Sequence, residues 1–257
     1  MSDLYWLTEE QMAKLAPFFP KSHGKPRVDD RRVLSGIIFI NRNGLRWRDA
    51  PEAYGPHKTL YSRWKRWSEK GIFARMMVCA DDGRSGRRTR RGKDRDDRRD
   101  LPEGTPHRDQ HGREKGGRGR LIGRTKGGMN TKLHVICDSQ GRPLSLFVTA
   151  GQVSDYIGAR ALLSSLPKVD WLLGDRGYDA DWFRDALKDK GIRACIPGRK
   201  QRTTKVKYDK RRYKRRNRIE IMFGRLKDWR RVATRYDRCP KVFLSAIALA
   251  AVVIYWL

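Results

Sequence analysis

The sequence has few cysteines, and their spacing does not suit a metal site. Zinc sites need clustered thiolates or imidazoles, often starting from a C-x-x-C pair, and no such pair occurs here. The cysteines lie more than 40 residues apart, at Cys79, Cys137, Cys195 and Cys239. The histidine pair at ligand spacing, His107 and His111, has no cysteine near it. We therefore expect no zinc site, and free thiols in a reducing compartment.

Long apolar segments are also lacking. The run 242–257 has 16 residues, with Ser245 as its one clearly polar member, whereas a membrane-spanning helix needs about 20. Its alanines favour a helix buried in a protein core. The N-terminal residues show no basic segment followed by an apolar core, so we expect no signal peptide. These absences predict a cytoplasmic protein that does not enter a membrane.

Acidic residues are about half as frequent as basic ones. There are 29 Asp and Glu against 59 Lys and Arg, which gives a formal net charge of +30 and a pI near 10.6. Such a chain repels itself unless a polyanion is close, so nucleic acid is the expected partner. Aromatic residues make up 10% of the chain and include eight Trp, which favours a packed core over a histone-like tail. The alternative is a folded protein whose basic surface is simply solvated.

Apolar residues are missing from one segment in particular. Leu101 is the one apolar residue among the 40 residues of 81–120. The whole chain is 38% hydrophobic, and without this segment it would reach about 45%, which is ordinary for globular proteins. The segment has 14 Lys and Arg and nine Asp and Glu, so it carries +5 and the rest of the chain +25. The sequence thus divides into 1–77, an apolar-poor block over 78–117, and 118–257.

Residues 1–77 have the pattern of three short helices. Thr8, followed by two acids, is typical of a helix N-cap, and a second helix is expected from Asp29 or Asp30 to Gly44. The third carries apolar side chains on one face, namely Leu60, Trp64 and Trp67. Away from that face it is basic, with Lys58, Arg63, Lys65 and Arg66. A basic third helix suits a helix-turn-helix domain that enters the DNA major groove; a plain helical bundle with a solvated basic face is the alternative.

The pattern changes at Gly128, where apolar residues begin to alternate with polar ones. Two strands joined by the turn Asp138–Gly141 predict a hairpin over 130–149. After it we expect a helix over 154–165, a strand over 169–174, a helix over 180–190, a strand over 192–196, a long basic helix over 208–230 and a last helix over 242–256. This order predicts an α/β fold with a mixed sheet.

Two carboxylates stand out in this second half. Asp175 follows a short buried strand, and the ends of such strands are where functional groups collect in α/β sheets. Glu220 belongs to the basic helix, in the apolar context Ile219-Glu220-Ile221. We expect it to face inward, and an inward carboxylate without a purpose is costly. The alternative is that Glu220 simply pairs with a neighbouring arginine.

The spacing around Glu220 forms a signature. Tyr213, Arg216, Glu220 and Lys227 obey Y-x2-R-x3-E-x6-K, and on a helix the last three fall near one face. This signature resembles that of bacterial insertion-sequence transposases of the DDE type, most closely the insertion-sequence-five family and its insertion-sequence-four relatives. Further segments resemble the family at 45–51, 64–67, 123–134, 151–155 and 231–237. The resemblance covers 4–77 and 116–257.

The resemblance implies a function for these residues. Such a transposase has an RNase-H-like mixed sheet with helices on both faces, preceded by the small helical DNA-binding domain. As a homo-oligomer it binds double-stranded DNA, at the insertion-sequence ends and at the target, in a bacterial cytoplasm close to the nucleoid. It cleaves and joins strands by two-metal phosphoryl transfer, with Mg²⁺ or Mn²⁺. Asp175 and Glu220 would be catalytic metal ligands. The DNA contacts would be Tyr213, Arg216 and Lys227, and in the first domain Arg63, Lys65 and Arg66.

The family's first catalytic Asp, however, has no counterpart here. It should end the first central strand upstream of Lys126, where the apolar-poor block cannot form a buried strand. Moving the reading frame by one base allows 93–112 to be recoded as KTVMIDATYLKAHRTATSM, which resembles the family's first strand, with its Asp codon across Arg98 and Arg99. We hypothesise that the frame is lost near 78–81 and regained near 112–117, and that this copy is inactive.

Two other functions stay open. The chain could be a DNA-binding protein without catalysis that interferes with an intact transposase. It could also be a basic nucleic-acid-binding protein, for RNA included, whose 78–117 block is a genuine disordered linker binding by counterion release. Metal-dependent nicking separates the transposase from both alternatives.

Overall fold

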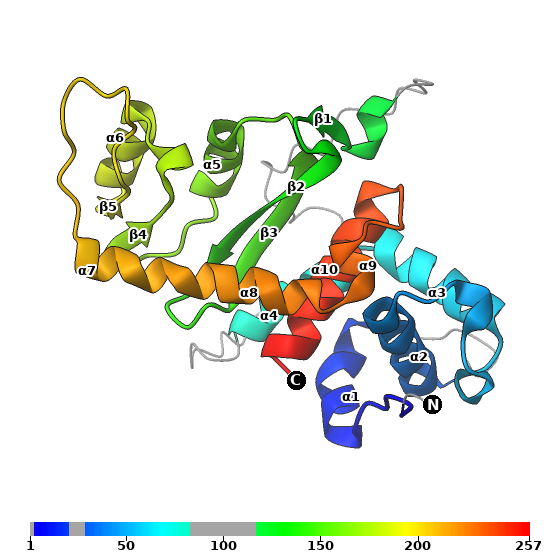
Figure 1. The fold of residues 1–257 in the computed structure, drawn as a ribbon. Helices are drawn as coiled ribbons and strands as arrows, with labels where there is room; N and C mark the ends of the chain where they lie inside the picture. Colours follow the sequence, from blue (N-terminus) through cyan, green and yellow to red (C-terminus); the bar gives the residue numbers. More distant parts are fainter. Residues whose placement is uncertain (1–2, 21–28, 83–116) are drawn as a thin grey trace. The chain divides into compact units, whose positions relative to one another are not determined.

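The computed structural model describes residues 3–20, 29–82 and 117–257, and every structural statement below concerns these residues. Their contacts divide the chain into two compact units. The helical unit comprises 1–85, 142–144 and 221–257, and the sheet unit comprises 86–141 and 145–220. Both are drawn in Figure 1. Most of the predicted 78–117 block lies outside the described residues.

The helices of the helical unit begin and end where local chemistry favours it. Helix α1 (Glu9–Leu15) starts with a capping box, in which Thr8 and Gln11 each bond the other's backbone N–H. Helix α2 (Asp30–Asn43) is capped by the Asp29 side chain and ends at Gly44, whose φ of 70° is left-handed. Helices α3 (His57–Glu69) and α4 (Ile72–Asp82) follow. The predicted starts at Thr8 and Asp29 and the predicted end at Gly44 are confirmed.

The C-terminal residues complete the core of this unit. Helix α10 (Pro240–Tyr255) packs on α2, α3 and most extensively on α4, while the short α9 (Arg230–Ala233) packs on α2. Trp64, Trp67 and Phe73 are fully buried, as are Ala246–Ala251 of α10. The expectation that 242–257 is a buried helix is therefore confirmed for most of its length. None of the described helices is both long and apolar enough to cross a membrane.

The sheet unit contains two small sheets. Strands β1 (Gly123–Thr125), β2 (Gly128–Cys137) and β3 (Pro143–Ala150) form the first, in the order β1-β2-β3, with β1 antiparallel to β2. The second is a parallel pair, β4 (Trp171–Leu173) and β5 (Arg193–Cys195). Helices α5 (Asp155–Leu163) and α6 (Asp181–Asp189) enclose a small core with β5, which includes Ala159, Phe183, Leu187 and Ile196. The α/β character is confirmed.

Two expectations about this region need correction. The single mixed sheet is replaced by two sheets among the described residues, β1-β2-β3 and β4-β5, and no strand of one pairs with a strand of the other. The long helix expected over 208–230 is helical without a gap over 210–227, as α7 (Lys210–Tyr213), a 3₁₀ turn (Lys214–Arg216) and α8 (Asn217–Lys227). It is therefore shorter than predicted and tightens to 3₁₀ geometry over three residues. The RNase-H-like topology and the helix-turn-helix stay predictions.

Candidate active site at the end of strand β4

Asp175 lies two residues beyond β4, where its half-buried carboxylate caps a 3₁₀ turn (Arg176–Tyr178). Its Oδ1 accepts a hydrogen bond from the Gly177 N–H at 2.8 Å. A Cβ on residue 177 would lie 2.9 Å from this Oδ1 and 2.8 Å from Oδ2 of Asp155. A side chain at residue 177 would therefore clash with two carboxylates, which explains the glycine there.

Asp155, the first residue of α5, is the neighbour of Asp175 that the sequence prediction missed. Lys132 of β2 reaches it with Nζ at 2.9 Å from Oδ1, and the same ammonium donates to the Val153 carbonyl at 2.7 Å. This cation links the first sheet to the start of α5. It also offsets part of the negative charge that Asp155 brings towards Asp175.

The pKa of Tyr178 reflects the charges around this turn. Burial raises the pKa of its hydroxyl to about 12, and the negative charges of Asp155 and Asp175 add to the rise, while Arg216 opposes it. Because these effects act over short distances, Tyr178 has both aspartates and Arg216 within its electrostatic neighbourhood. Charges from the end of β4, from the start of α5 and from the basic helix therefore all act on this one hydroxyl.

Glu220 does not face inward, so that expectation is wrong. Its side chain is 56% exposed, and its Oε1 accepts a hydrogen bond from Arg216 at 2.9 Å. The helix buries Met222 and Leu226 instead, and even Ile221 is 52% exposed. Apolar neighbours in sequence did not define the buried face of α8, because adjacent helix positions are about 100° apart. The alternative reading, a pair with a neighbouring arginine, is what the structure contains.

The remaining signature residues are Tyr213 and Lys227. The Arg216 guanidinium lies 5.9 Å from the centre of the Tyr213 ring, and Tyr213 packs edge-on against Tyr208. Lys227 is exposed on α8, seven residues after Glu220 and so close to the same side of that helix. Tyr213, Arg216 and Glu220 are therefore brought together, by a turn of 3₁₀ helix joined to a turn of α-helix.

The start of the basic helix is anchored to β4. The Trp171 ring lies between two guanidinium groups, with Arg193 at 4.2 Å and Arg212 at 4.4 Å from its centre. Arg212 also bonds Asp209, which caps α7. Such cation–π contacts contribute about 0.5–2 kcal/mol each. They hold a strongly basic stretch against the edge of the sheet that carries Asp175.

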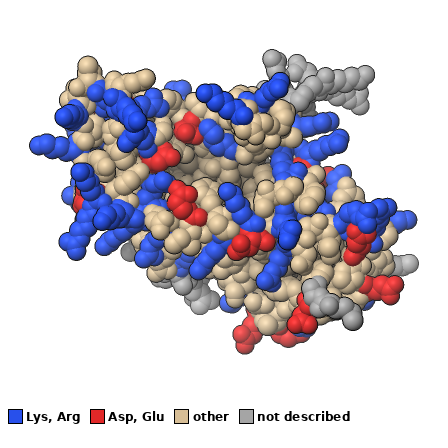
Figure 2. All heavy atoms as spheres, in the orientation of Figure 1, with Lys and Arg blue, Asp and Glu red and all other residues tan. Residues whose placement is uncertain are grey.

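That stretch is the most basic in the described chain. Between 199 and 218 there are twelve Lys and Arg and one acidic residue, Asp209. Figure 2 shows Lys and Arg gathered over β5, α6 and α7, at the left of the view. A surface of this kind attracts a polyanion and accelerates its association.

The basic residues of α3 differ from one another in the helical unit. Arg63 is turned inward, since it pairs with Asp30 at 3.1 Å and stacks over Trp67. Lys65 lies over the Tyr61 ring at 6.0 Å. Arg66 lines a shallow open hollow whose other walls are Lys58, Thr59, Ser62 and Arg63. Arg66 is therefore better placed than Arg63 for an external partner.

Whether a metal ion fits this site can be judged from the side-chain atoms that could coordinate it. Among the described residues no three His, Cys, Asp or Glu side chains come together as a metal site. Asp175 and Asp155 offer hard oxygen atoms that suit Mg²⁺, but Glu220 is held by Arg216. The described residues therefore do not by themselves form the two-metal site that the resemblance implies.

The geometry places a carboxylate at a strand end and a strongly basic helix in the same unit, and comparison with known proteins gives the family. The family model described as "Transposase DDE domain" matches residues 100–255. A second, described as "Putative transposase of IS4/5 family", matches residues 7–77. The chain belongs to the DDE transposases of insertion sequences. Members of this family normally use divalent metal ions and act on DNA.

Several curated proteins are similar to the chain. The "Putative transposase for insertion sequence element IS6501" of Brucella ovis is 36% identical over 128 residues, 49% of this chain and 98% of that protein. The "Putative transposase for insertion sequence element IS402" of Burkholderia cepacia is 29% identical over 156 residues, 53% of this chain and 72% of that protein. No solved structure matches the chain.

Proposed function

We propose that this transposase binds the DNA ends of its insertion sequence with α3 and with the basic stretch 199–218, and that this copy does not cut them. The observation that carries the proposal is the site at the end of β4. There the turn of Asp175 and Tyr178 is contacted by Arg199, from a stretch 199–218 that has twelve cations, Arg216 among them, and a single acid. Arg216 pairs with Glu220, two residues beyond that stretch. A surface of this sign fits the phosphate backbone of DNA.

The family reaction sets the roles of these residues. Asp175 and Glu220 would each supply carboxylate oxygens for Mg²⁺ or Mn²⁺, which in two-metal enzymes activates the attacking oxygen and steadies the leaving one. Arg216 and Lys227 would contact phosphates on either side of Glu220, with Tyr213 supporting Arg216. In the helical unit, Arg66 and Lys65 would contact DNA from the surface of α3. Arg63 would instead hold that helix in place through its ion pair with Asp30.

Two observations support loss of catalysis in this copy. The segment 81–120 has one apolar residue in 40, and 93–112 can be recoded one base away as a peptide that resembles the family's first strand with its Asp. In addition, β1 pairs with β2 only over Gly128–Asn130. Within the described residues, the rest of that edge of β2 is left without a strand beside it, and β4–β5 forms a sheet of its own. A strand ending in the missing Asp would fill such an edge.

The deciding experiment compares the chain with a version whose reading frame is restored over 78–117. Both are incubated in Mg²⁺ with a duplex carrying the element's own terminal repeats. We expect both to bind the duplex and only the restored chain to nick it. Asp175→Asn and Glu220→Gln in the restored chain should abolish nicking but keep binding. Nicking by the unrestored chain that is lost on Glu220→Ala would overturn the proposal, as would gene codons over 93–112 that do not spell the family strand.

The restored chain also tests the alternatives. If it binds the duplex but never nicks it, the protein is a DNA-binding protein without catalysis. Stronger binding to single-stranded RNA than to the duplex would instead favour the basic RNA-binding function. We further propose that the chain binds the terminal repeats as a homo-oligomer, which light scattering of the complex would measure.

A further inference from the structure

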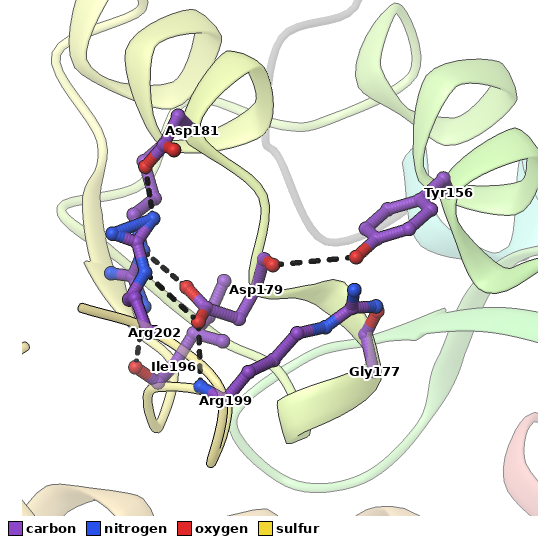
Figure 3. Close-up of polar contacts among 8 residues, drawn as sticks. Tyr156, Gly177, Asp179, Asp181, Ile196, Arg199 and Arg202 are labelled. Carbon is purple, nitrogen blue, oxygen red and sulfur yellow. Dashed lines mark hydrogen bonds and ion pairs between the residues drawn. The ribbon is translucent and has the colours of Figure 1, made fainter.

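A second aspartate lies buried among arginines four residues after Asp175. The Asp179 side chain is fully buried and accepts three hydrogen bonds (Figure 3). Their donors are Arg184 Nε at 2.8 Å, the Arg199 backbone N–H at 2.7 Å and Arg202 Nε at 3.2 Å. A buried carboxylate is stable only with such partners. Two of the three come from the segment after β5, so Asp179 fixes the path of that segment.

The segment after β5, held in place by Asp179, brings the Arg199 side chain next to the turn that Asp175 caps. Its Nη2 donates to the Gly177 carbonyl at 3.2 Å, and its guanidinium lies 4.5 Å from the centre of the Tyr156 ring. Figure 3 shows the side chain extended between these two groups. Gly177 is two residues from Asp175 and bonds it through the N–H. Arg199 is therefore a cation held in one direction at the candidate active site.

The arginines around Asp179 differ in what they are bonded to. Arg184 bonds Asp179 and the Ile196 carbonyl, and Arg202 bonds Asp179 and Asp181. Within the part of the chain that the structure describes, the exposed Arg199 guanidinium contacts a carbonyl and an aromatic ring but forms no ion pair. Arg184 and Arg202 are thus bound to acidic groups of the chain itself. The positive charge of Arg199 is available to bind an external anion. A guanidinium held in this way suits a phosphate, which it can bind through two N–H groups.

Its neighbours extend the same charge along the segment. Residues 197–207 contain five cations and no acid: Arg199, Lys200, Arg202, Lys205 and Lys207. Four of them, all but Arg202, are exposed. A row of exposed cations beside one rigid arginine fits an extended phosphodiester backbone better than a single small anion, because the charges are spread along the chain.

We propose that 197–207 is a DNA-backbone contact, that Arg199 binds a phosphate of the strand held beside Asp175, and that Asp179 is the positioning residue for Arg199. This rests on the proposed function, because it takes DNA to be the ligand at the end of β4. It goes further by assigning particular roles within the basic stretch to two residues outside the family signature, a phosphate contact to Arg199 and its positioning to Asp179.

The test is binding of the full chain to a DNA duplex, measured by fluorescence anisotropy at a series of salt concentrations. Arg199→Ala should weaken binding about 5-fold at moderate salt and reduce the slope of log K against log[salt] by about one. Arg199→Lys should keep that slope but recover only part of the affinity, since it retains the charge and loses the planar fork. The matched control is Lys188→Ala, which removes an exposed cation from the last turn of α6. Equal slopes for wild type and Arg199→Ala would overturn the proposal.

Positioning by Asp179 is tested in the same assay. Asp179→Asn should reduce affinity and slope as Arg199→Ala does, and the double variant should bind like Arg199→Ala alone, because the two residues act through one contact. Additive losses would refute the positioning role. If Asp179→Asn fails to fold, Tyr156→Leu, which removes the ring under Arg199 and the long hydroxyl bond to the Asp179 carbonyl, should give a smaller loss in the same direction. Binding and nicking are measured separately, so a failed nicking test and a failed Arg199 test have separate readouts.

Discussion

The carboxylate of Glu220 and the guanidinium of Arg216 form a hydrogen-bonded ion pair of 2.9 Å across one turn. With 56% and 27% of these side chains exposed, water screens the pair, and it stabilises the fold by about 0.5 kcal/mol or less. Its consequence is electrostatic. While Glu220 holds Arg216, part of the positive charge at the site is cancelled.

Glu220→Gln should therefore strengthen DNA binding. Removing the carboxylate charge frees Arg216 for phosphate, so we expect a few-fold gain in duplex affinity at low salt that shrinks as salt rises. Anisotropy titrations measure it. Asp185→Asn is the control, since it removes one exposed acidic charge from α6 and leaves Arg216 paired. An equal gain in both variants would show that only net charge matters.

Asp179 should give stability a distinctive dependence on pH. Burial opposes its ionisation, but the Arg199 N–H and the Arg184 and Arg202 guanidinium groups together hold its pKa below its ordinary value. The pKa of Asp179 is lower in the folded chain than in the unfolded chain. The ionised carboxylate therefore stabilises the fold fully above the unfolded pKa, near 4, and this stabilisation is lost as the pH falls through the folded pKa.

At neutral pH, Asp179→Asn should lower the unfolding free energy by roughly 2–4 kcal/mol. The difference from wild type should shrink below about pH 4. Urea unfolding over a series of pH values measures both effects. A difference that stayed constant down to pH 2 would contradict the assignment.

Tyr178 should ionise later than an ordinary tyrosine. Its pKa is raised to about 12 by burial first and by Asp155 and Asp175 next, so Tyr178→Phe should remove one phenolate from the late part of an alkaline absorbance titration. Asp155→Asn should lower the midpoint of that phenolate without restoring the ordinary value, since burial is the larger cause. A Tyr178 midpoint near 10 would mean that the turn is open to solvent.

Two glycines in helices should respond in opposite directions to alanine. At Gly36 of α2 a Cβ would lie 2.7 Å from the Cβ of the buried Tyr54, so Gly36→Ala should destabilise by roughly 1–3 kcal/mol despite its better helix propensity. Gly224 of α8 has no atom within 4 Å of its Cβ position. Gly224→Ala should stabilise by up to about 1 kcal/mol. Thermal unfolding of the two variants compares the directions, and destabilisation by both would show that α8 does not tolerate a side chain there.

The elements that sequence analysis predicted well are those specified by adjacent residues. Thr8 and Asp29 place helix starts because the capping side chain and its target N–H are two or three residues apart. The hairpin over 130–149 follows from its turn and its alternation. By contrast, the packing of α10 on α4 joins segments more than 150 residues apart, which local patterns do not specify.

The site was predictable to a similar extent. Asp175 could be located because a strand end precedes it, and the signature residues because their spacing is fixed. The partners of Asp179 could not, since Arg199 and Arg202 follow it by 20 and 23 residues across a strand and a loop. Glu220 was placed on the wrong side of its helix because its apolar neighbours suggested burial, whereas the i,i+4 relation to Arg216 determined its surroundings.

The packing of α10 on α4 also has a consequence for synthesis on the ribosome. The helical unit is assembled from both ends of the chain, and Ala246–Ala251 are among its most deeply buried residues. Helices α2, α3 and α4 emerge first but cannot close their core until the last residues have left the exit tunnel. Any message truncated after α4 would therefore yield an N-terminal half with an uncovered apolar face, a substrate for chaperones and proteases rather than a free DNA-binding fragment.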